Sequence, residues 1–198
     1  MRKAIGLLLI ANALAIAALA AAPVPGKANE FVIHTPEGKD MLLSSYRGKT
    51  VVLALMFTTC PHCQKVAQIL SSVQKEYADR GVQVLGATFD PNAATQVKQF
   101  DQIFVKGFPC GYSSNNEVLR FLQQPATNPP FVPIFVFIDK AGIIRALHMV
   151  TGDTPENGPE QKFFATPEVT IRAELDKMLK GEKTSSAAAS APKKSPKS

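Results

Sequence analysis

The pattern of apolar positions changes its period several times along the chain. Continuous apolar runs rich in β-branched residues, such as 50–57 and 82–89, are typical of strands that are buried on both faces. Apolar residues three and four apart, as over 66–77, are typical of a helix with one buried face. The elements predicted in this way are, in chain order, a hairpin over 31–41, a glycine-closed helical turn over 42–49, a strand over 50–57, a helix from 60, a strand over 82–89, helices from 90 and 114, a hairpin of strands 131–138 and 143–150, and a closing helix from 166.

Two of the predicted helices begin with recognisable capping residues. Ser114 and Glu117 have the spacing of a capping box, and Thr166 followed by Pro167 is a strong helix start. The apolar positions assigned to buried helix faces are Ala94, Val97, Phe100 and Phe104 in the second helix, Val118, Leu119 and Leu122 in the third, and Ile171, Leu175, Met178 and Leu179 in the last. This order predicts an α/β fold in which helices flank a central mixed β-sheet that has an N-terminal β-hairpin.

The two ends of the chain differ in composition from its centre. Residues 1–22 combine a basic start, an alanine-rich apolar run and a small-residue cleavage pattern, which predicts a secretory signal peptide. An uncleaved N-terminal anchor is the alternative, because the run approaches the length that spans a bilayer. Residues 181–198 have no apolar period and predict a disordered Ser/Ala/Lys/Pro tail. A linker over 23–29 and a folded domain over 30–180 remain between these ends.

Most of the net positive charge lies in the two ends. Of the formal +6, the N-terminal segment carries +2 and the tail carries +3, which leaves +1 for residues 21–180. The predicted domain is therefore nearly neutral and gives no argument for binding nucleic acid.

Candidate chemistry is concentrated in three cysteines, which are too few for a disulfide-stapled scaffold. Cys60 and Cys63 follow a predicted buried strand directly and open a helix. Unpaired N–H groups at a helix N-terminus stabilise a thiolate, so we expect Cys60 to be the nucleophile and Cys63, one turn further on, to close the disulfide. Pro61 suits the first helical turn, and a protonated His62 would further favour the Cys60 thiolate.

The same pair is also half of a structural zinc site, which needs four ligands. Cys110 and the three histidines of the chain offer no second closely spaced pair, so the sequence predicts no metal and no other cofactor. Cys110 is left over. A semi-buried structural thiol and a second resolving or intermolecular cysteine both stay open for it.

The chain is similar to the redoxin (AhpC/TSA-like) branch of the thioredoxin superfamily over about residues 30–180. The motifs that carry this resemblance are Gly38-Lys39, Leu42/Leu43-Ser44, Arg47-Gly48-Lys49 and Val51-Val52-Leu53 before the Cys-x-x-Cys pair, residues 82–90, Phe108-Pro109, and Val132-Pro133 followed by residues 135–142. The resemblance implies a thioredoxin-like three-layer sandwich in which Cys60 attacks and Cys63 resolves. It also implies that Pro133 is a cis-proline beside the dithiol and that the backbone next to it, at Val132, pairs with a substrate strand.

The resemblance to TlpA/ResA-type members implies an exported thiol–disulfide oxidoreductase, periplasmic or otherwise extracytoplasmic and possibly membrane-tethered. Its expected partners are the thiols and disulfides of exported proteins and an upstream redox partner, and the chain is expected to be a monomer. Thr59 stands where most relatives have Trp, and the Cys-Pro-His-Cys and Val-Pro elements are similar to those of DsbA-type oxidases. The direction of electron flow therefore stays open.

Two other functions use parts of the same pattern. A peroxiredoxin-like antioxidant shares the fold, but peroxiredoxins have Pro and Thr seven and three residues before their reactive cysteine, where this chain has Leu53 and Phe57. A copper-binding protein of the Sco type would use both cysteines and a distant histidine such as His148. That family spaces its cysteines one residue further apart.

Overall fold

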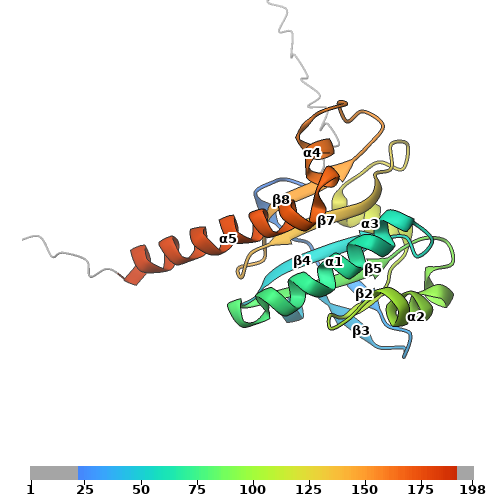
Figure 1. Cartoon of the computed structure of the whole chain (residues 1–198), viewed down its shortest axis with the longest axis horizontal. Helices are drawn as coiled ribbons and strands as arrows, with labels where there is room; N and C mark the ends of the chain where they lie inside the picture. Colours follow the sequence, from blue (N-terminus) through green and yellow to red (C-terminus); the bar gives the residue numbers. More distant parts are fainter. Residues whose placement is uncertain (1–21, 191–198) are drawn as a thin grey trace, which may run out of the picture.

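The computed structural model describes residues 22–190, with side chains through Gly181, and these residues form one mixed sheet of eight strands (Figure 1). The strands are β1 Gly26–Lys27, β2 Val32–His34, β3 Asp40–Leu42, β4 Thr50–Met56, β5 Val82–Thr88, β6 Cys110–Tyr112, β7 Phe131–Ile138 and β8 Ile143–Val150, and their order across the sheet is β1-β8-β7-β4-β5-β6-β2-β3. The predicted signal peptide lies outside the described residues except for Ala22, and so do residues 191–198 of the predicted tail.

Strand β4 lies in the interior of the sheet, and all seven of its residues are buried. It runs parallel to β5, with Met56 opposite Thr88, and antiparallel to β7, with Leu55 opposite Ile134. A strand covered on both faces has no polar side to alternate with, which explains its continuous apolar sequence. The residues that follow β4 therefore start from a fixed point at one edge of the sheet.

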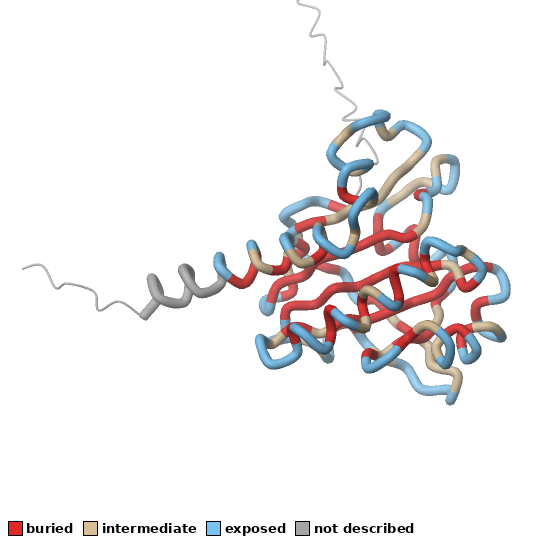
Figure 2. Tube along the Cα trace, in the orientation of Figure 1, coloured by how far each residue is buried: buried red, intermediate tan, exposed pale blue. Residues whose placement is uncertain are grey.

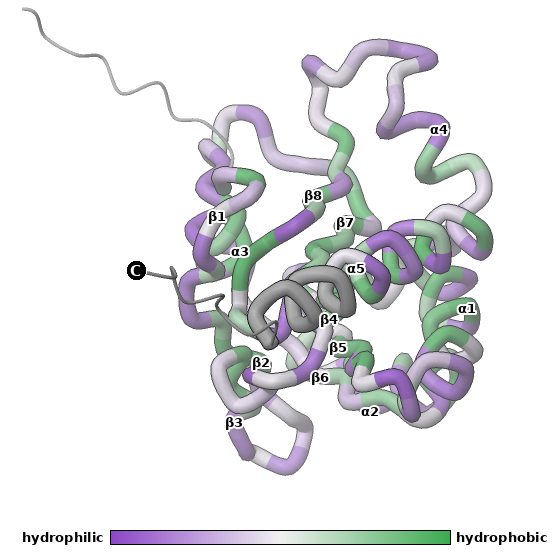
Figure 3. Tube along the Cα trace, turned by 90° about the vertical axis from the view of Figure 1, so that its left-hand side faces the viewer, coloured by the Kyte–Doolittle hydropathy of each residue, from purple (hydrophilic) through white to green (hydrophobic). Residues whose placement is uncertain are grey.

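Helices cover both faces of the sheet. Their bounds are α1 Pro61–Tyr77, α2 Ala93–Phe104, α3 Asn115–Leu122, α4 Pro159–Ala165 and α5 Pro167–Ser190, with 3-10 turns at Leu43–Tyr46 and Ala78–Arg80. Figure 3 shows α1 and α2 on one side of the sheet and α3 on the other, and Figure 2 shows the buried residues concentrated in the strands between them. One apolar cluster lies under α1, α2, α4 and α5, and a second lies under α3 and the N-terminal segment.

Most of the elements predicted from the sequence are confirmed. The hairpin of β2 and β3 pairs Val32 with Leu42. At the start of α3, Ser114 Oγ accepts a hydrogen bond from the Glu117 N–H at 3.2 Å, and Glu117 Oε2 accepts one from the Ser114 N–H at 3.2 Å. The capping box is therefore present in full.

Some details of the helices differ from the prediction. Helix α2 turns Ala93 rather than Ala94 toward the core, because it begins at Ala93 and the buried face is completed by Val97 and Phe100. Helix α4 was not predicted. It has only seven residues, too few for an apolar period to be visible.

The predicted borders of the domain also differ from the structure at both ends. Gly26–Lys27, in the predicted linker, pairs with Ile144 and Ile143 of β8. Helix α5 continues to Ser190, past the predicted start of the tail at 181. Within residues 22–190, no helix combines the length and the apolar character needed to cross a membrane.

A tertiary contact joins the 3-10 turn before β4 to the turn between β7 and β8. Arg47 Nη1 donates a hydrogen bond to the Ala141 carbonyl at 2.8 Å. Its guanidinium fills the space that a Cβ atom at residue 142 would occupy, and Gly142 has a φ of +79°. Only glycine suits this position, both for its backbone conformation and for the space it leaves open.

Candidate active site

The Cys-x-x-Cys pair lies where β4 passes into α1. Cys60 is the N-cap residue of α1 and Pro61 occupies the first turn. The Cys60 N–H donates to the Phe57 carbonyl at 3.3 Å, and the Cys60 carbonyl accepts from the Gln64 N–H at 3.0 Å. The Cys60 sulfur is thereby held at the positive end of a 17-residue helix, where an anion is stabilised.

The two sulfurs differ in their access to solvent. Cys60 is partly exposed, whereas Cys63 is fully buried, and both are reduced thiols in the structure. Burial raises the pKa of the Cys63 thiol well above its usual range, and the hydrogen bond and charge of Cys60 raise that pKa further. The Phe57 N–H acts in the opposite direction, since it donates to Cys63 Sγ at 3.5 Å. The arrangement therefore offers one accessible sulfur and one protected, protonated sulfur beside it.

The two residues between the cysteines both face solvent. Pro61 and His62 are exposed at the start of α1. The proline fits the first turn without losing an intrahelical hydrogen bond. The proposed tuning of Cys60 by His62 stays a prediction.

The peptide bond between Val132 and Pro133 is cis. Leu55 of β4 is paired with Ile134 of β7, so the next position along each strand brings Pro133 beside Met56, at the edge where the Cys-x-x-Cys segment begins. Val132 and Cys60 are partly buried, and both pack against the apolar cluster that contains Cys63. This register brings Val132 and Pro133 to the dithiol end of the sheet, and their expected pairing with a substrate strand stays a prediction.

A buried carboxylate at the same edge was missed by the sequence interpretation. Asp90 lies two residues after the end of β5 and is 8% exposed. Its carboxylate accepts from the Thr58 N–H at 2.6 Å and from the Thr58 hydroxyl at 2.8 Å. The Thr58 hydroxyl oxygen also lies 2.6 Å from Gln96 Oε1 on α2.

The carboxylate also acts on Cys63. The charge of Asp90 is one of the causes that raise the pKa of Cys63. An acidic residue just beyond β5 could have been noticed from the sequence, because parallel strands β4 and β5 end at the same edge. Its contact with Thr58 could not, since it depends on the spacing between two segments that lie 32 residues apart.

Cys110 lies in β6, away from solvent. It is 9% exposed and stands opposite Gly86 of β5. A Cβ atom added at Gly86 would lie 2.8 Å from Cys110 Sγ and 3.2 Å from Met56 Cε, so the sulfur fills a space that exists because residue 86 is glycine. Burial, together with the charge of Asp101, raises the pKa of the Cys110 thiol. These surroundings favour the structural role for Cys110.

His148 is engaged by its neighbours in the fold. Its Nδ1 atom lies 3.2 Å from Glu160 Oε2, and its ring stacks on Phe163 at a centroid distance of 3.7 Å. Among the residues that the structure describes, no group of three or more His, Cys, Asp or Glu side chains is arranged to hold a metal ion. The copper-binding alternative therefore finds no support in this geometry.

The positions that would mark a peroxiredoxin are apolar. Leu53 is fully buried in β4, and the Phe57 ring packs on Phe89 at 4.7 Å. Neither side chain has a hydroxyl group that could bind a peroxide next to Cys60.

Comparison with known proteins gives one matching family model and several relatives named as thioredoxin-like proteins or thiol-disulfide oxidoreductases. The model of the AhpC/TSA family matches residues 24–147. The thiol-disulfide oxidoreductase ResA of Geobacillus kaustophilus (strain HTA426) is 29% identical over 133 residues, which are 67% of this chain and 71% of the relative. The thioredoxin-like protein YneN of Bacillus subtilis (strain 168) is 25% identical over 143 residues, 69% of this chain and 76% of the relative.

Solved structures agree in fold at low sequence identity. An uncharacterized conserved protein from Geobacillus kaustophilus has a TM-score of 0.61 at 19% identity, covering 80% of this chain and 83% of that structure. A thiol:disulfide interchange protein of the thioredoxin family from Chlorobium tepidum TLS has a TM-score of 0.55 at 21% identity, covering 71% and 95%. The predicted α/β, thioredoxin-like sandwich is thus confirmed.

Proposed function

Because the chain belongs to the AhpC/TSA family, we propose that it is a thiol–disulfide oxidoreductase whose reaction uses Cys60 and Cys63. The observation that carries the proposal is the asymmetry of the pair: an accessible sulfur at a helix N-terminus lies beside a buried one whose pKa is raised. Relatives named thiol-disulfide oxidoreductase support the same activity.

The reaction is an exchange of sulfur–sulfur bonds. The Cys60 thiolate attacks one sulfur of a client disulfide, the client bond breaks, and the other client sulfur leaves as a thiolate. Cys63 then loses its proton and attacks Cys60 Sγ, which releases the client's second thiolate and forms the Cys60–Cys63 disulfide. Two electrons pass from the dithiol to the client, and the reverse sequence oxidises a client dithiol.

Each neighbour of the dithiol has a proposed part in this exchange. The α1 N-terminus stabilises the Cys60 thiolate, and His62 adds to this when it is protonated. Val132 offers backbone groups to a client segment beside Pro133. Burial keeps Cys63 protonated, and the charge of Asp90 adds to this effect.

The site of action that we propose is extracytoplasmic. The apolar start of the sequence supports export, by a cleaved signal or with a membrane tether. The proposed clients are exported proteins, served by a monomer that exchanges electrons with an upstream redox partner and uses no further cofactor.

Trapping of the mixed disulfide tests the proposal. A Cys63→Ser variant lacks the resolving sulfur, so after incubation with a disulfide-bonded client peptide it accumulates an adduct through Cys60, visible on non-reducing gels and by mass spectrometry. Cys110→Ser is the matched control and leaves turnover unchanged. If Cys63→Ser forms no adduct, or forms it through Cys110, the proposed function is wrong.

The direction of electron flow is measured separately. Equilibration of the wild-type protein with glutathione gives the reduction potential of the Cys60–Cys63 couple. A value near −120 mV assigns an oxidant, and one at or below about −270 mV assigns a reductant.

A further inference from the structure

The start of β7 presents a large apolar side chain to solvent. Phe131 is 62% exposed, more than any other large apolar side chain that the structure describes, and the other exposed ones (Val24, Leu42, Ile103 and Val169) are all aliphatic. An aromatic ring left in water forgoes the free energy that its burial would give. The disulfide exchange described above gives Phe131 no part.

Phe131 lies at the edge of the sheet where the dithiol segment begins. Strand β4 ends at Met56, opposite Pro133, so Val132 and Phe131 extend past its end. On the other side β7 keeps its partner, since Phe131 is paired with Val150 of β8. One side of this short stretch of strand is therefore held by β8, and the other side faces the segment that carries the dithiol.

Prolines limit the hydrogen-bond donors around Phe131. The stretch 129–133 contains three prolines, which have no N–H, so Phe131 and Val132 supply its only backbone donors. Val132 also packs against the apolar cluster that contains Cys63. An extended client segment that reaches this edge of the sheet can therefore pair with the backbone at Val132, and the side chain next to that pairing site is Phe131.

Two loops fix the backbone that carries Phe131. In the loop before β7, Asn128 Nδ2 donates a hydrogen bond to Asp153 Oδ2 at 2.6 Å. Asn128 Oδ1 accepts one from the Gly152 N–H at 3.2 Å. Both partners lie in the loop directly after β8, whose last residue, Val150, is paired with Phe131. The ring is thus attached to a backbone that is fastened in place before a client binds.

The proposed reaction itself brings a client chain to this edge. In a disulfide, the Cα atoms of the two cysteines are about 4.4–6.8 Å apart, so the client backbone passes directly over Cys60 in the mixed disulfide. Successive residues of an extended chain are about 3.3 Å apart, so a client residue within three positions of its cysteine lies up to about 10 Å from it. Phe131 stands three strand positions, also about 10 Å, beyond the last pair that β7 makes with β4. Client residues close to the reacting cysteine therefore come within reach of the ring.

We propose that Phe131 is a specificity-determining residue of the exchange, and that it contacts a large apolar side chain located within three residues of the client cysteine. The inference rests on the proposed function, because it is the bond to Cys60 that brings the client to this ring. An aromatic or aliphatic client side chain on Phe131 removes apolar surface of both from water, whereas a serine in the same place does not. The exchange therefore selects clients in which an apolar residue flanks the reactive disulfide.

A peptide scan tests the inference. Each probe is a seven-residue peptide with cysteine at its centre, phenylalanine at one of the six flanking positions and serine at the rest, used as its symmetric disulfide dimer. The Cys63→Ser variant attacks one peptide sulfur through Cys60 and releases the other peptide as a thiolate, and mass spectrometry follows the adduct. We expect at least one phenylalanine peptide to react about tenfold faster than the peptide with serine at all six positions.

Substitution of Phe131 separates a contact with the client from a structural role. Phe131→Ser, added to Cys63→Ser, is expected to reduce the preference to about twofold or less and to leave the rate with the all-serine peptide unchanged. Phe131→Leu keeps most of the preference, because leucine still offers apolar surface. Ile103→Ser removes another exposed apolar side chain, near the end of α2, and is the matched control that keeps the whole preference.

The outcomes separate the two proposals. If no peptide forms an adduct, the proposed function is wrong. If adducts form but no flanking phenylalanine accelerates the reaction, or the preference survives in Phe131→Ser, the specificity role is wrong and the oxidoreductase remains. An equal slowing of the phenylalanine and all-serine peptides in Phe131→Ser would assign the ring a structural role and would likewise overturn the inference.

Discussion

The start of α1 and strand β6 each hold a buried cysteine in the same apolar cluster, and burial raises the pKa of both thiols. The two places differ in what surrounds the sulfur. Cys63 has a partly exposed cysteine one helical turn away, at a helix N-terminus, and a carboxylate whose charge acts on it. Cys110 faces Gly86 in the middle of a sheet. If the proposed function holds, the comparison teaches that burial alone does not make a thiol inert: Cys63 takes part in redox chemistry because an accessible cysteine lies beside it.

The substitution that tests this comparison most strongly is Cys60→Ser. A serine hydroxyl neither ionises at neutral pH nor forms disulfides, so we expect disulfide exchange to fall to the uncatalysed rate, a loss on the order of 1,000-fold or more. Turnover of a disulfide-bonded peptide measures the loss. Cys110→Ser removes a sulfur of the same kind and keeps full activity. An equal loss in both variants would contradict the distinction between the two regions.

Gly86→Ala tests the packing around β6. The new Cβ atom would lie 2.8 Å from Cys110 Sγ and 3.2 Å from Phe108 Cε2, so the sheet or the sulfur has to shift. We expect a loss of about 2 kcal/mol in the free energy of unfolding, measured by urea denaturation. The combined variant Gly86→Ala with Cys110→Ala regains part of the loss, because the sulfur that blocks the methyl group is gone. If the double variant regains no stability, the loss in Gly86→Ala comes from the backbone and not from the contact with Cys110.

Asp90→Asn tests the electrostatic part of the dithiol region. Asparagine keeps the shape and can still accept from the Thr58 N–H, but it removes a charge that raises the pKa of Cys63. The raised pKa makes resolution of the mixed disulfide accelerate with pH across the neutral range, because only the thiolate attacks. In the variant we expect this acceleration to begin at lower pH. Resolution at neutral pH is then about three- to fourfold faster for each pKa unit removed, because the thiolate fraction rises about tenfold while the nucleophilicity of the thiolate falls.

Stopped-flow release of the client from the mixed disulfide at several pH values gives this profile. Slower resolution at every pH would contradict the electrostatic effect and would assign Asp90 a direct part in moving the proton of Cys63. Gln96→Glu, which changes the charge near Thr58 rather than at Asp90, is a useful comparison because Gln96 also contacts that threonine.

The smallest effect is expected from Cys110→Ala at alkaline pH. The folded pKa of this thiol is raised, so the folded protein keeps a proton that the unfolded chain releases above a pH of about 8.5. Its contribution to stability is therefore present at lower pH and is lost as the pH rises. The variant should lose stability less steeply, by at most about 1.4 kcal/mol per pH unit. Urea titrations at pH 8 and pH 10 check this, and identical slopes would contradict it.

The sequence pattern was sufficient to predict the strands and helices that have an apolar run or a capping motif of their own. The apolar run at 50–57 and the capping box of Ser114 and Glu117 are complete within a few residues, and the structure has both. Strand β6, in contrast, has three residues around Gly111 and pairs only because β5 and β2 lie on its two sides. Such a strand has no period of its own to detect.

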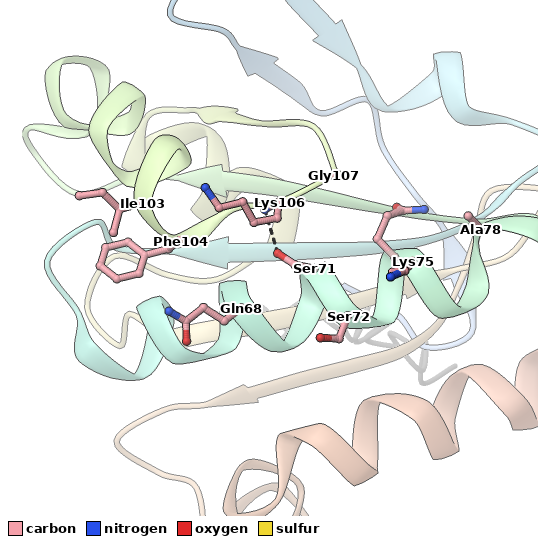
Figure 4. Close-up of a pocket in the computed structure, with 10 residues that line it drawn as sticks. Gln68, Ser71, Ser72, Lys75, Ala78, Ile103, Phe104, Lys106 and Gly107 are labelled. Atoms are coloured by element: carbon pink, nitrogen blue, oxygen red, sulfur yellow. Dashed lines mark hydrogen bonds between the residues drawn. The ribbon is translucent and has the colours of Figure 1, made fainter.

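The candidate site likewise has residues that could be predicted from the sequence and contacts that could not. Cys60 and Cys63 are three residues apart in sequence and could be assigned a helix N-terminus from the strand before them. The Asp90–Thr58 contact depends on the register of β4 and β5, which the residues alone do not give, whereas the position of Pro133 near the dithiol was implied by the family resemblance. A groove between α1 and the end of α2, lined by Ser71 and Phe104 among others (Figure 4), depends on the distance between two helices and is likewise a product of packing.

The contact between Arg47 and the Ala141–Gly142 turn has a consequence for how this sequence can vary. The guanidinium uses the very volume that a side chain at residue 142 would need, so the two positions are not independent. A larger residue at 142 would push out the arginine and break its hydrogen bond to Ala141. We expect aligned homologues in which glycine is replaced here to have lost the arginine as well, and thus two sites 95 residues apart to be inherited as a pair.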